Sequence, residues 1–254
     1  MAFPTLKVEQ IGAIVTVTLN RPEKLNAINA QMHQDLQAVC AQLRDDLDTR
    51  VVILTGAGRA FTAGADLSES GTAPTEPVQA RRQAQTGMRT SAALEGLEQI
   101  TIAAVNGLAI GGGVVFSLCC DLRLAAESAW FSIPEVNLGL PWTWNALPRL
   151  VREVGPSRAL ELVSTGDRFS AQQALEWGMV NYVVHDAELL QAAEALAGKI
   201  AAKPPLPVAM NKATIRALKR GTESGEVTYS DGDLLMLSRW LRSGDAQDGK
   251  GVRR

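Results

Sequence analysis

Short apolar runs alternate with amphipathic stretches along most of the chain. Leu6–Gln10 and Ile14–Leu19 flank Gly12 and predict two strands joined as a hairpin. The β-branched run Val51–Thr55 and the similar run Thr101–Val105 have the length of strands and predict two more. Further strands are predicted at Asp121–Ala125 and Val180–Val184.

Helical periodicity marks the segments between these strands. Asn29 is a suitable N-cap for a helix over Ala30–Leu43, whose apolar residues lie on one face. Asp66 followed by Glu69 resembles a capping box that begins a short helix, and the Ser-, Gly-, Thr- and Pro-rich stretch Ser68–Pro77 predicts a mobile loop. Other helices are predicted at Gln79–Gly96, Gly112–Cys119, Ser157–Ser164, Ala171–Trp177, Leu189–Ala202, Pro207–Arg220 and Tyr229–Leu241.

Strands alternate with helices up to about residue 190, and the pattern is nearly all helical beyond it. This order predicts an α/β fold with a core over residues 1–190 and a helical C-terminal subdomain over residues 191–254. No fixed-period sequence repeat is evident, although β-β-α units can recur in the structure.

The composition is that of a globular protein without a strong electrostatic preference. Apolar residues make up 46% of the 254 residues and the net charge is −2, which gives no reason to expect nucleic acid or an anionic membrane as a partner. No apolar run has membrane-spanning length and the first residues do not resemble a signal peptide, so we expect a cytoplasmic protein. Cys40, Cys119 and Cys120 lack metal-ligand spacing, so no metal is expected, and the last two should be buried thiols.

Two glycine-bearing segments carry the strongest chemical signal. Phe61–Leu67 and Asn106–Gly113 each follow a predicted strand and precede a predicted helix. Small residues at such a junction expose unpaired backbone N–H groups, and two junctions brought together could hold negative charge on a carbonyl oxygen. The sequence therefore predicts an oxyanion hole, although glycines at this place can also serve tight packing of a helix on a strand.

Glu135 is a lone acid within the apolar stretch Phe131–Leu140. Burial would raise the pKa of its carboxyl toward the range useful for proton transfer. A structural pair with Arg149 would explain the same residue equally well. His33 and His185 lack a partner motif and no G-x-S-x-G sequence occurs, so a Ser-His-Asp hydrolase is weakly supported.

Together, these segments resemble the crotonase, or enoyl-CoA hydratase/isomerase, superfamily. The resemblance implies a crotonase-like spiral of β-β-α units, C-terminal helices that support a homotrimer or homohexamer, and an acyl-CoA thioester as the ligand. No cofactor is implied beyond the CoA moiety of that substrate. The matching segments are Asn20–Ile28, Phe61–Leu67, Asn106–Gly113, Cys120-Asp121, Pro134–Gly139 and Trp177–Asn181.

The resemblance also implies roles for individual residues. The main-chain N–H groups of Ala63 and Gly112 match the two oxyanion-hole donors for the thioester carbonyl. A second group matches the segments that bind CoA, either along its arm or near its adenine end. This group comprises Gly64, Ala65, Asp66 and Leu67 for the arm, and Lys24, Asn26 and Ala27 for the adenine end.

The chain departs from the family pattern at the catalytic acids. Hydratases of this family use two glutamates, and Val115 stands where the first is expected, whereas Glu135 matches the second. Trp142 and Trp144 replace a glycine-rich stretch and are expected, with Val115, to line and narrow the acyl pocket, although packing alone would also explain them. One acid suits an isomerase-like proton shuttle. Hydration assisted by Asn145, a non-catalytic acyl-CoA-binding role, and a decarboxylase or C–C hydrolase remain alternatives.

Overall fold

The computed structural model describes residues 3–69 and 76–220. By internal packing the chain divides into two units, Met1–Lys203 and Pro204–Arg254. The first unit extends past the boundary expected near residue 190, because helix α8 (Leu189–Ala201) packs against the central strands of its sheet. In the second unit the described part is helix α9 (Pro205–Arg220). The helix predicted at Tyr229–Leu241 lies outside the described residues, as does most of the loop predicted at Ser68–Pro77.

The first unit contains a six-stranded sheet that confirms the α/β class. Its outer hairpin is antiparallel, and its other neighbouring strands are parallel. All six residues of its third strand are buried, as expected for a parallel strand covered on both faces. In spatial order the strands are β1 (Leu6–Ile11), β2 (Ile14–Leu19), β3 (Val51–Gly56), β5 (Ile100–Val105), β7 (Leu122–Ala126) and β10 (Tyr182–Val184).

A second sheet was not predicted from the sequence. Each of its four strands has only three residues, too few to show an alternation of apolar and polar positions. The first three strands are parallel and the last is antiparallel to its neighbour. In spatial order they are β4 (Ala60–Thr62), β6 (Leu108–Ile110), β8 (Trp130–Ser132) and β9 (Arg168–Ser170).

The two sheets are threaded by a repeating β-β-α path. A strand of the large sheet leads to a strand of the small sheet and then to helix: β3-β4 before α2 and α3, β5-β6 before α4, and β7-β8 before α5. Successive turns place equivalent strands side by side in each sheet. This is the β-β-α spiral that the resemblance implies.

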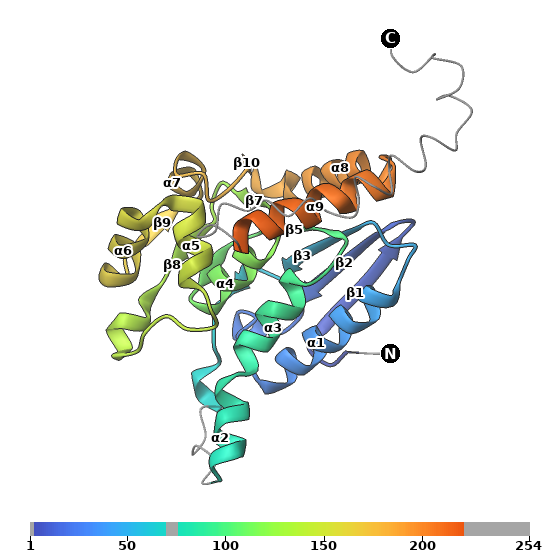
Figure 1. Cartoon of the computed structure of the whole chain (residues 1–254). Helices are drawn as coiled ribbons and strands as arrows, with labels where there is room; N and C mark the ends of the chain where they lie inside the picture. Colours follow the sequence, from blue (N-terminus) through green and yellow to red (C-terminus); the bar gives the residue numbers. More distant parts are fainter. Residues whose placement is uncertain (1–2, 70–75, 221–254) are drawn as a thin grey trace, which may run out of the picture. The chain divides into compact units, whose positions relative to one another are not determined.

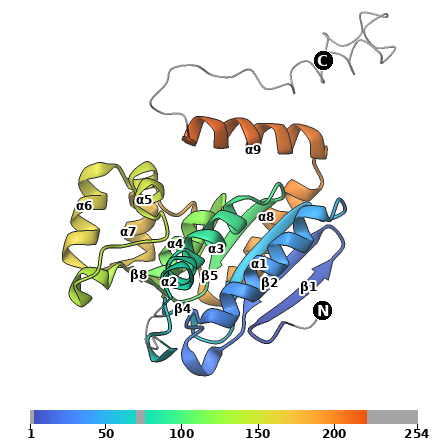
Figure 2. The same ribbon diagram turned by 60° about the horizontal axis from the view of Figure 1, so that its bottom comes forward.

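The helices lie around these sheets as Figures 1 and 2 show. α1 and α3 lie side by side, α3 also contacts α4, and α5, α6 and α7 gather near the small sheet. α5 was not predicted, and Pro148 stands at its start, where proline is tolerated. The bounds are α1 (Ala30–Asp45), α2 (Pro77–Ala84), α3 (Thr86–Glu95), α4 (Gly112–Cys119), α5 (Leu147–Val154), α6 (Pro156–Thr165) and α7 (Ala171–Glu176), with 3-10 turns at η1 (Pro22–Lys24), η2 (Leu67–Glu69), η3 (Pro134–Leu138) and η4 (Asp186–Glu188).

Helix α3 begins at a break that the sequence prediction missed. One helix over Gln79–Gly96 was expected, but α2 ends and α3 begins around Gln85. The Thr86 hydroxyl donates to the Arg82 carbonyl, and Gly87 follows, so two residues with weak helix preference meet at the break. The break places Gly87 at the start of α3, where it becomes important for the cavity described below.

Cys119 and Cys120 are buried thiols, as predicted, and Cys40 is a buried thiol as well. Within the described ranges, no helix is both long and apolar enough to cross a membrane.

Candidate active site

The two glycine-bearing segments meet beside a cavity of about 430 Å³. A Cβ placed on Gly64 would lie 2.7 Å from the Ile110 carbonyl oxygen and 3.5 Å from the Gly112 nitrogen. Gly64 also has a φ of +84°, a conformation that side chains rarely adopt. The close approach predicted for the two segments is therefore present, and glycine is required for it.

The hydrogen bonds at this junction show that one of the two predicted oxyanion-hole donors is wrong. The Ala63 N–H donates to the Leu25 carbonyl (2.9 Å), so it is not available for a ligand. The Gly64 N–H is bonded to the Thr62 hydroxyl and the Asp66 N–H to the Ile28 carbonyl. No partner exists for the Ala65 N–H among the described residues, and Ala65 lines the cavity. The free donor of this segment is therefore Ala65.

The position of the free donor follows from a short parallel bridge between Ile28 and Ala65. Gly64 and Asp66 direct their bonding groups toward Ile28, and alternate residues of an extended segment point in opposite directions. The Ala65 N–H thus points away from the bridge. Sequence spacing alone could not show this alternation, because the bridge joins segments that are distant in the chain.

Gly112, the second predicted donor, has a free N–H. It is the first residue of α4, so its N–H has no intrahelical partner, and none is found elsewhere in the described part of the chain. The positive end of the α4 dipole adds to the attraction for negative charge at this point.

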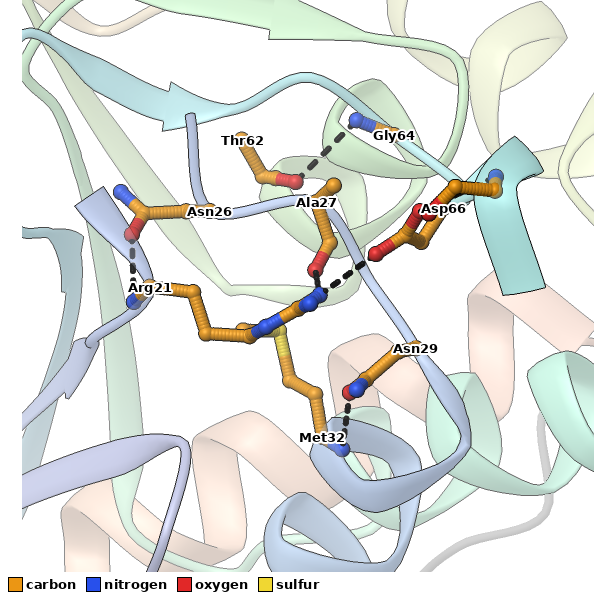
Figure 3. A network of polar contacts seen from close by, with 9 residues as sticks. Arg21, Asn26, Ala27, Asn29, Met32, Thr62, Gly64 and Asp66 are labelled. Atoms are coloured by element: carbon orange, nitrogen blue, oxygen red, sulfur yellow. Dashed lines mark hydrogen bonds and ion pairs between the residues drawn. The ribbon is translucent and has the colours of Figure 1, made fainter. Parts of the chain in front are cut away.

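A polar network fixes the Ala65 segment to the loop after β2 (Figure 3). The Arg21 guanidinium donates to the Ala27 carbonyl (2.6 Å) and pairs with Asp66 (2.8 Å). Hydrogen bonds from the Ser68 hydroxyl and from Arg21 hold the pKa of the Asp66 carboxyl below its ordinary value. The Asp66 carboxylate therefore holds the loop and is not free to contact CoA.

Asn26 is likewise a structural residue of this loop. It is fully buried, accepts from the Arg21 N–H, and donates to the carbonyls of Ala57 and Ala60. No exposed atom of its side chain is available for the CoA contact that the resemblance implies. Lys24 is exposed and, like Ala27, does not line the cavity, whereas Leu67 does.

Glu135 projects from η3 into the same cavity. A Cβ placed on Gly111 would lie 2.3 Å from Glu135 Oε1, so the absence of a side chain at Gly111 makes room for the carboxylate. Glu135 Oε2 has no hydrogen-bond partner in the described residues. Burial raises the pKa of the carboxyl above its ordinary value, and a hydrogen bond from its own backbone N–H opposes this rise. The structural pair with Arg149 is absent, because Arg149 pairs with Glu95 on α3 at 2.8 Å.

Val115, Trp142 and Trp144, the residues expected in the acyl pocket, line this cavity. Val115 is almost completely buried and can neither hold water nor exchange a proton. Of the described residues that line the cavity, only Glu135 carries a carboxylate. Asn137 and Thr143 are its other polar side chains, and Asn145 is not part of the lining.

His33 is a buried neutral residue beside the cavity wall rather than a general base. His33 Nδ1 lies within hydrogen-bond distance of Thr90 Oγ1 (2.9 Å), and this hydroxyl also contacts the Thr86 carbonyl and accepts from the Gln37 side-chain amide. Burial lowers the pKa of His33 to about 4. His185 is exposed and lies outside the cavity lining.

Comparisons with known proteins agree with this geometry. The family model for enoyl-CoA hydratase/isomerase matches residues 9–254. Short-chain-enoyl-CoA hydratase of Clostridium acetobutylicum is 38% identical over 224 residues, which cover 88% of this chain and 84% of the relative. The crystal structure of enoyl-CoA hydratase from Bacillus anthracis has a TM-score of 0.84 at 36% identity and covers 96% of this chain and 94% of its own. The structure of a monofunctional enoyl CoA isomerase from M. smegmatis has a TM-score of 0.75 at 32% identity, covering 88% and 97%. The chain therefore belongs to the enoyl-CoA hydratase/isomerase family and has the crotonase fold.

Proposed function

We propose that the protein moves the double bond of an enoyl-CoA thioester by transferring one proton between two carbons. The observation that carries this proposal is Glu135, the one carboxylate among the described residues that line the cavity onto which the free N–H groups of Ala65 and Gly112 open. An oxyanion hole and one acid/base group are sufficient for such a transfer.

The two N–H groups would act on the thioester oxygen. When a proton leaves C2 of a 3-enoyl thioester, negative charge develops on that oxygen, and two aimed donors stabilise it. Each donor of this kind typically lowers the barrier by on the order of 3 kcal/mol. Ala65 takes the place that the sequence prediction gave to Ala63, because only its N–H is free.

Glu135 would carry the proton. Its carboxylate removes the proton from C2 of the 3-enoyl thioester, the electrons delocalise through the dienolate, and the protonated carboxyl returns the same proton to C4. The product is the 2-enoyl thioester, and no atom is gained or lost. An elevated pKa suits both halves of this transfer, since the carboxyl must accept and release the proton.

The CoA arm would pass along the segment Gly64–Leu67 at the cavity edge. Gly64, Ala65 and Leu67 line the cavity, and Leu67 is exposed on its outer side. Lys24 could approach the CoA phosphates from the neighbouring loop. The proposed form of the protein in the cell is a cytoplasmic homotrimer or homohexamer, as the family resemblance implies.

Hydration of a 2-enoyl thioester is the second candidate, favoured by the relative from Clostridium acetobutylicum that is named a hydratase. It would require a water held by Glu135 together with Asn137 or Thr143, since Val115 cannot hold one. Turnover of 3-hexenoyl-CoA without turnover of 2-hexenoyl-CoA would favour double-bond transfer. The reverse result would favour hydration.

The direct test replaces Glu135 by Gln and measures kcat on both thioesters. We expect a loss of about 10²- to 10⁴-fold, the usual contribution of a general acid/base. Glu176→Gln makes the same chemical change at an exposed position of α7 and should leave kcat unchanged. In the unmodified protein, kcat should fall as the pH drops through the raised pKa of Glu135, because the base must be ionised.

Unchanged turnover in Glu135→Gln would contradict the proposal. Binding of saturated thioesters without turnover of any enoyl substrate would instead indicate a binding protein. Conversion of a β-keto thioester would indicate a decarboxylase or C–C hydrolase.

A further inference from the structure

The indole of Trp144 fills the space between the cavity and helices α1 and α3. A Cβ placed on Gly112 would lie 2.5 Å from Trp144 Cζ3, and one placed on Gly87 would lie 2.1 Å from Trp144 Nε1. The six-membered ring therefore touches the start of α4, and the five-membered ring touches the start of α3. Both contacts require glycine at the facing position.

Two further rings hold the indole in this place. Phe116 stacks on it, with ring centroids 5.7 Å apart and an interplanar angle of 28°. His33 on α1 meets it edge-on, with centroids 5.1 Å apart. Trp144 is thus packed on the side away from the cavity by α1, α3 and α4.

The backbone around Trp144 is strained, and the buried guanidinium of Arg149 holds it in place. Trp144 and Asn145 have φ of +60° and +58°, a left-handed conformation that is unfavourable for non-glycine residues. Arg149 Nη1 donates to the carbonyls of both residues, at 3.2 and 2.6 Å, while its Nη2 pairs with Glu95 of α3. The Trp142 indole N–H adds a bond to the Gly111 carbonyl at 3.3 Å. These contacts set the orientation of the Trp144 ring.

We propose that Trp144 closes the inner end of the acyl pocket and restricts the protein to thioesters of short acyl chains. This inference rests on the proposed function, in which the thioester oxygen lies at the Gly112 N–H. The acyl carbons then begin beside Gly112, which the indole already touches. An acyl chain that extends toward α3 meets the Trp144 indole after a few carbons.

Removal of the indole would lengthen the pocket rather than create a separate void. The vacated space would be bounded by Gly112, Phe116, His33 and Gly87, and Gly112 itself lines the cavity. Each methylene that enters such an apolar space should lower Kd about fourfold.

The test measures Kd by calorimetry for butyryl-, hexanoyl-, octanoyl- and dodecanoyl-CoA, which contain no double bond to react. For the unmodified protein we expect no gain in affinity beyond hexanoyl-CoA. For Trp144→Ala we expect Kd to fall from hexanoyl- to octanoyl-CoA by about fifteenfold, corresponding to two buried methylenes. Trp177→Ala removes a half-buried indole at the C-cap of α7 that does not line the cavity, and it should keep the profile of the unmodified protein.

A second pair of variants tests the same packing without opening the pocket. Gly87→Ala places a methyl group where the indole lies, so it should push Trp144 toward the cavity and weaken butyryl-CoA binding by tenfold or more. In the Trp144→Ala background the same change should have little effect. Gly198→Ala adds a methyl group to helix α8 with no atom within 4 Å and serves as the matched control.

Two results would overturn the role of Trp144. One is an affinity of the unmodified protein that keeps rising to dodecanoyl-CoA, which would mean that the chain leaves past the exposed Leu138 and Leu140 instead. The other is an unchanged chain-length profile in a folded Trp144→Ala protein. Because the saturated thioesters report binding alone, loss of the proposed reaction in the separate turnover assay would leave this readout interpretable.

Discussion

Asn26 offers a quantitative test of whether the loop after β2 is held by its side chain. Asn26→Ala removes three hydrogen bonds, to the Arg21 N–H and to the carbonyls of Ala57 and Ala60, at 2.8–2.9 Å. At about 1 kcal/mol each they amount to about 3 kcal/mol. The φ of +56° adds about 1–2 kcal/mol, since asparagine tolerates the left-handed region better than alanine. We expect a total loss of about 4–5 kcal/mol in the free energy of unfolding.

Urea denaturation followed by circular dichroism measures this loss. With an m value of about 3 kcal/mol/M, the midpoint should fall by about 1.5 M. Asn26→Gly loses the same hydrogen bonds but accepts the positive φ, so it should be the more stable of the two variants by about 1 kcal/mol. A midpoint shift below about 0.3 M for Asn26→Ala would refute the reasoning. If Asn26→Ala shifted the midpoint this little but lost affinity for the thioester, the Asn26 amide would contact the ligand rather than hold the loop.

Two further predictions concern residues around the cavity. His33 takes up a proton near pH 6.5 in the unfolded chain but only near pH 4 in the folded protein, so its contribution to stability is complete above pH 6.5 and is lost as the pH falls toward 4. The loss should be on the order of 3 kcal/mol, and His33→Gln should remove that part of the pH dependence of urea unfolding. Gly111→Ala should displace the Glu135 carboxylate, whose Oε1 lies 2.3 Å from the added methyl position, and lower kcat by about 100-fold. Unchanged kcat in a folded Gly111→Ala protein would contradict the placement of Glu135.

The sequence pattern was sufficient for the elements that bury a long apolar face. The strands of the large sheet and the helix capped by Asn29 lie within a few residues of their predicted bounds, and the Asn29 side chain accepts from the Met32 N–H as a cap should. The small sheet was missed because strands of three residues carry no periodic signal. It is specified by tertiary contacts, since each of its strands follows a strand of the large sheet or pairs with a neighbour already in place.

The candidate site was predicted in its parts but not in its hydrogen bonding. Glu135, Gly112 and the segment Gly64–Leu67 reach the cavity or its edge, whereas Ala63 proved to be bonded to Leu25. The pairing of Arg149 with Glu95 could not be foreseen either. Both contacts join residues more than twenty positions apart in the sequence, where spacing gives no information about which groups are already bonded.

Backbone strain in the described part of the chain gathers in two loops, one that supports the Ala65 segment and one that lines the cavity. The non-glycine residues with positive φ are two consecutive pairs, Leu25-Asn26 and Trp144-Asn145. At about 1–3 kcal/mol per residue, each pair is stable only because the surrounding structure compensates it. The Asn26 amide does so in the first loop and the Arg149 guanidinium in the second. In the first loop, the Leu25 carbonyl accepts from the Ala63 N–H, and Ala65 keeps the free N–H of its segment. The second loop places the Trp144 indole against Gly112. The strained loops therefore hold two features of the cavity in place: the free Ala65 N–H on one side and the apolar wall formed by Trp144 on the other.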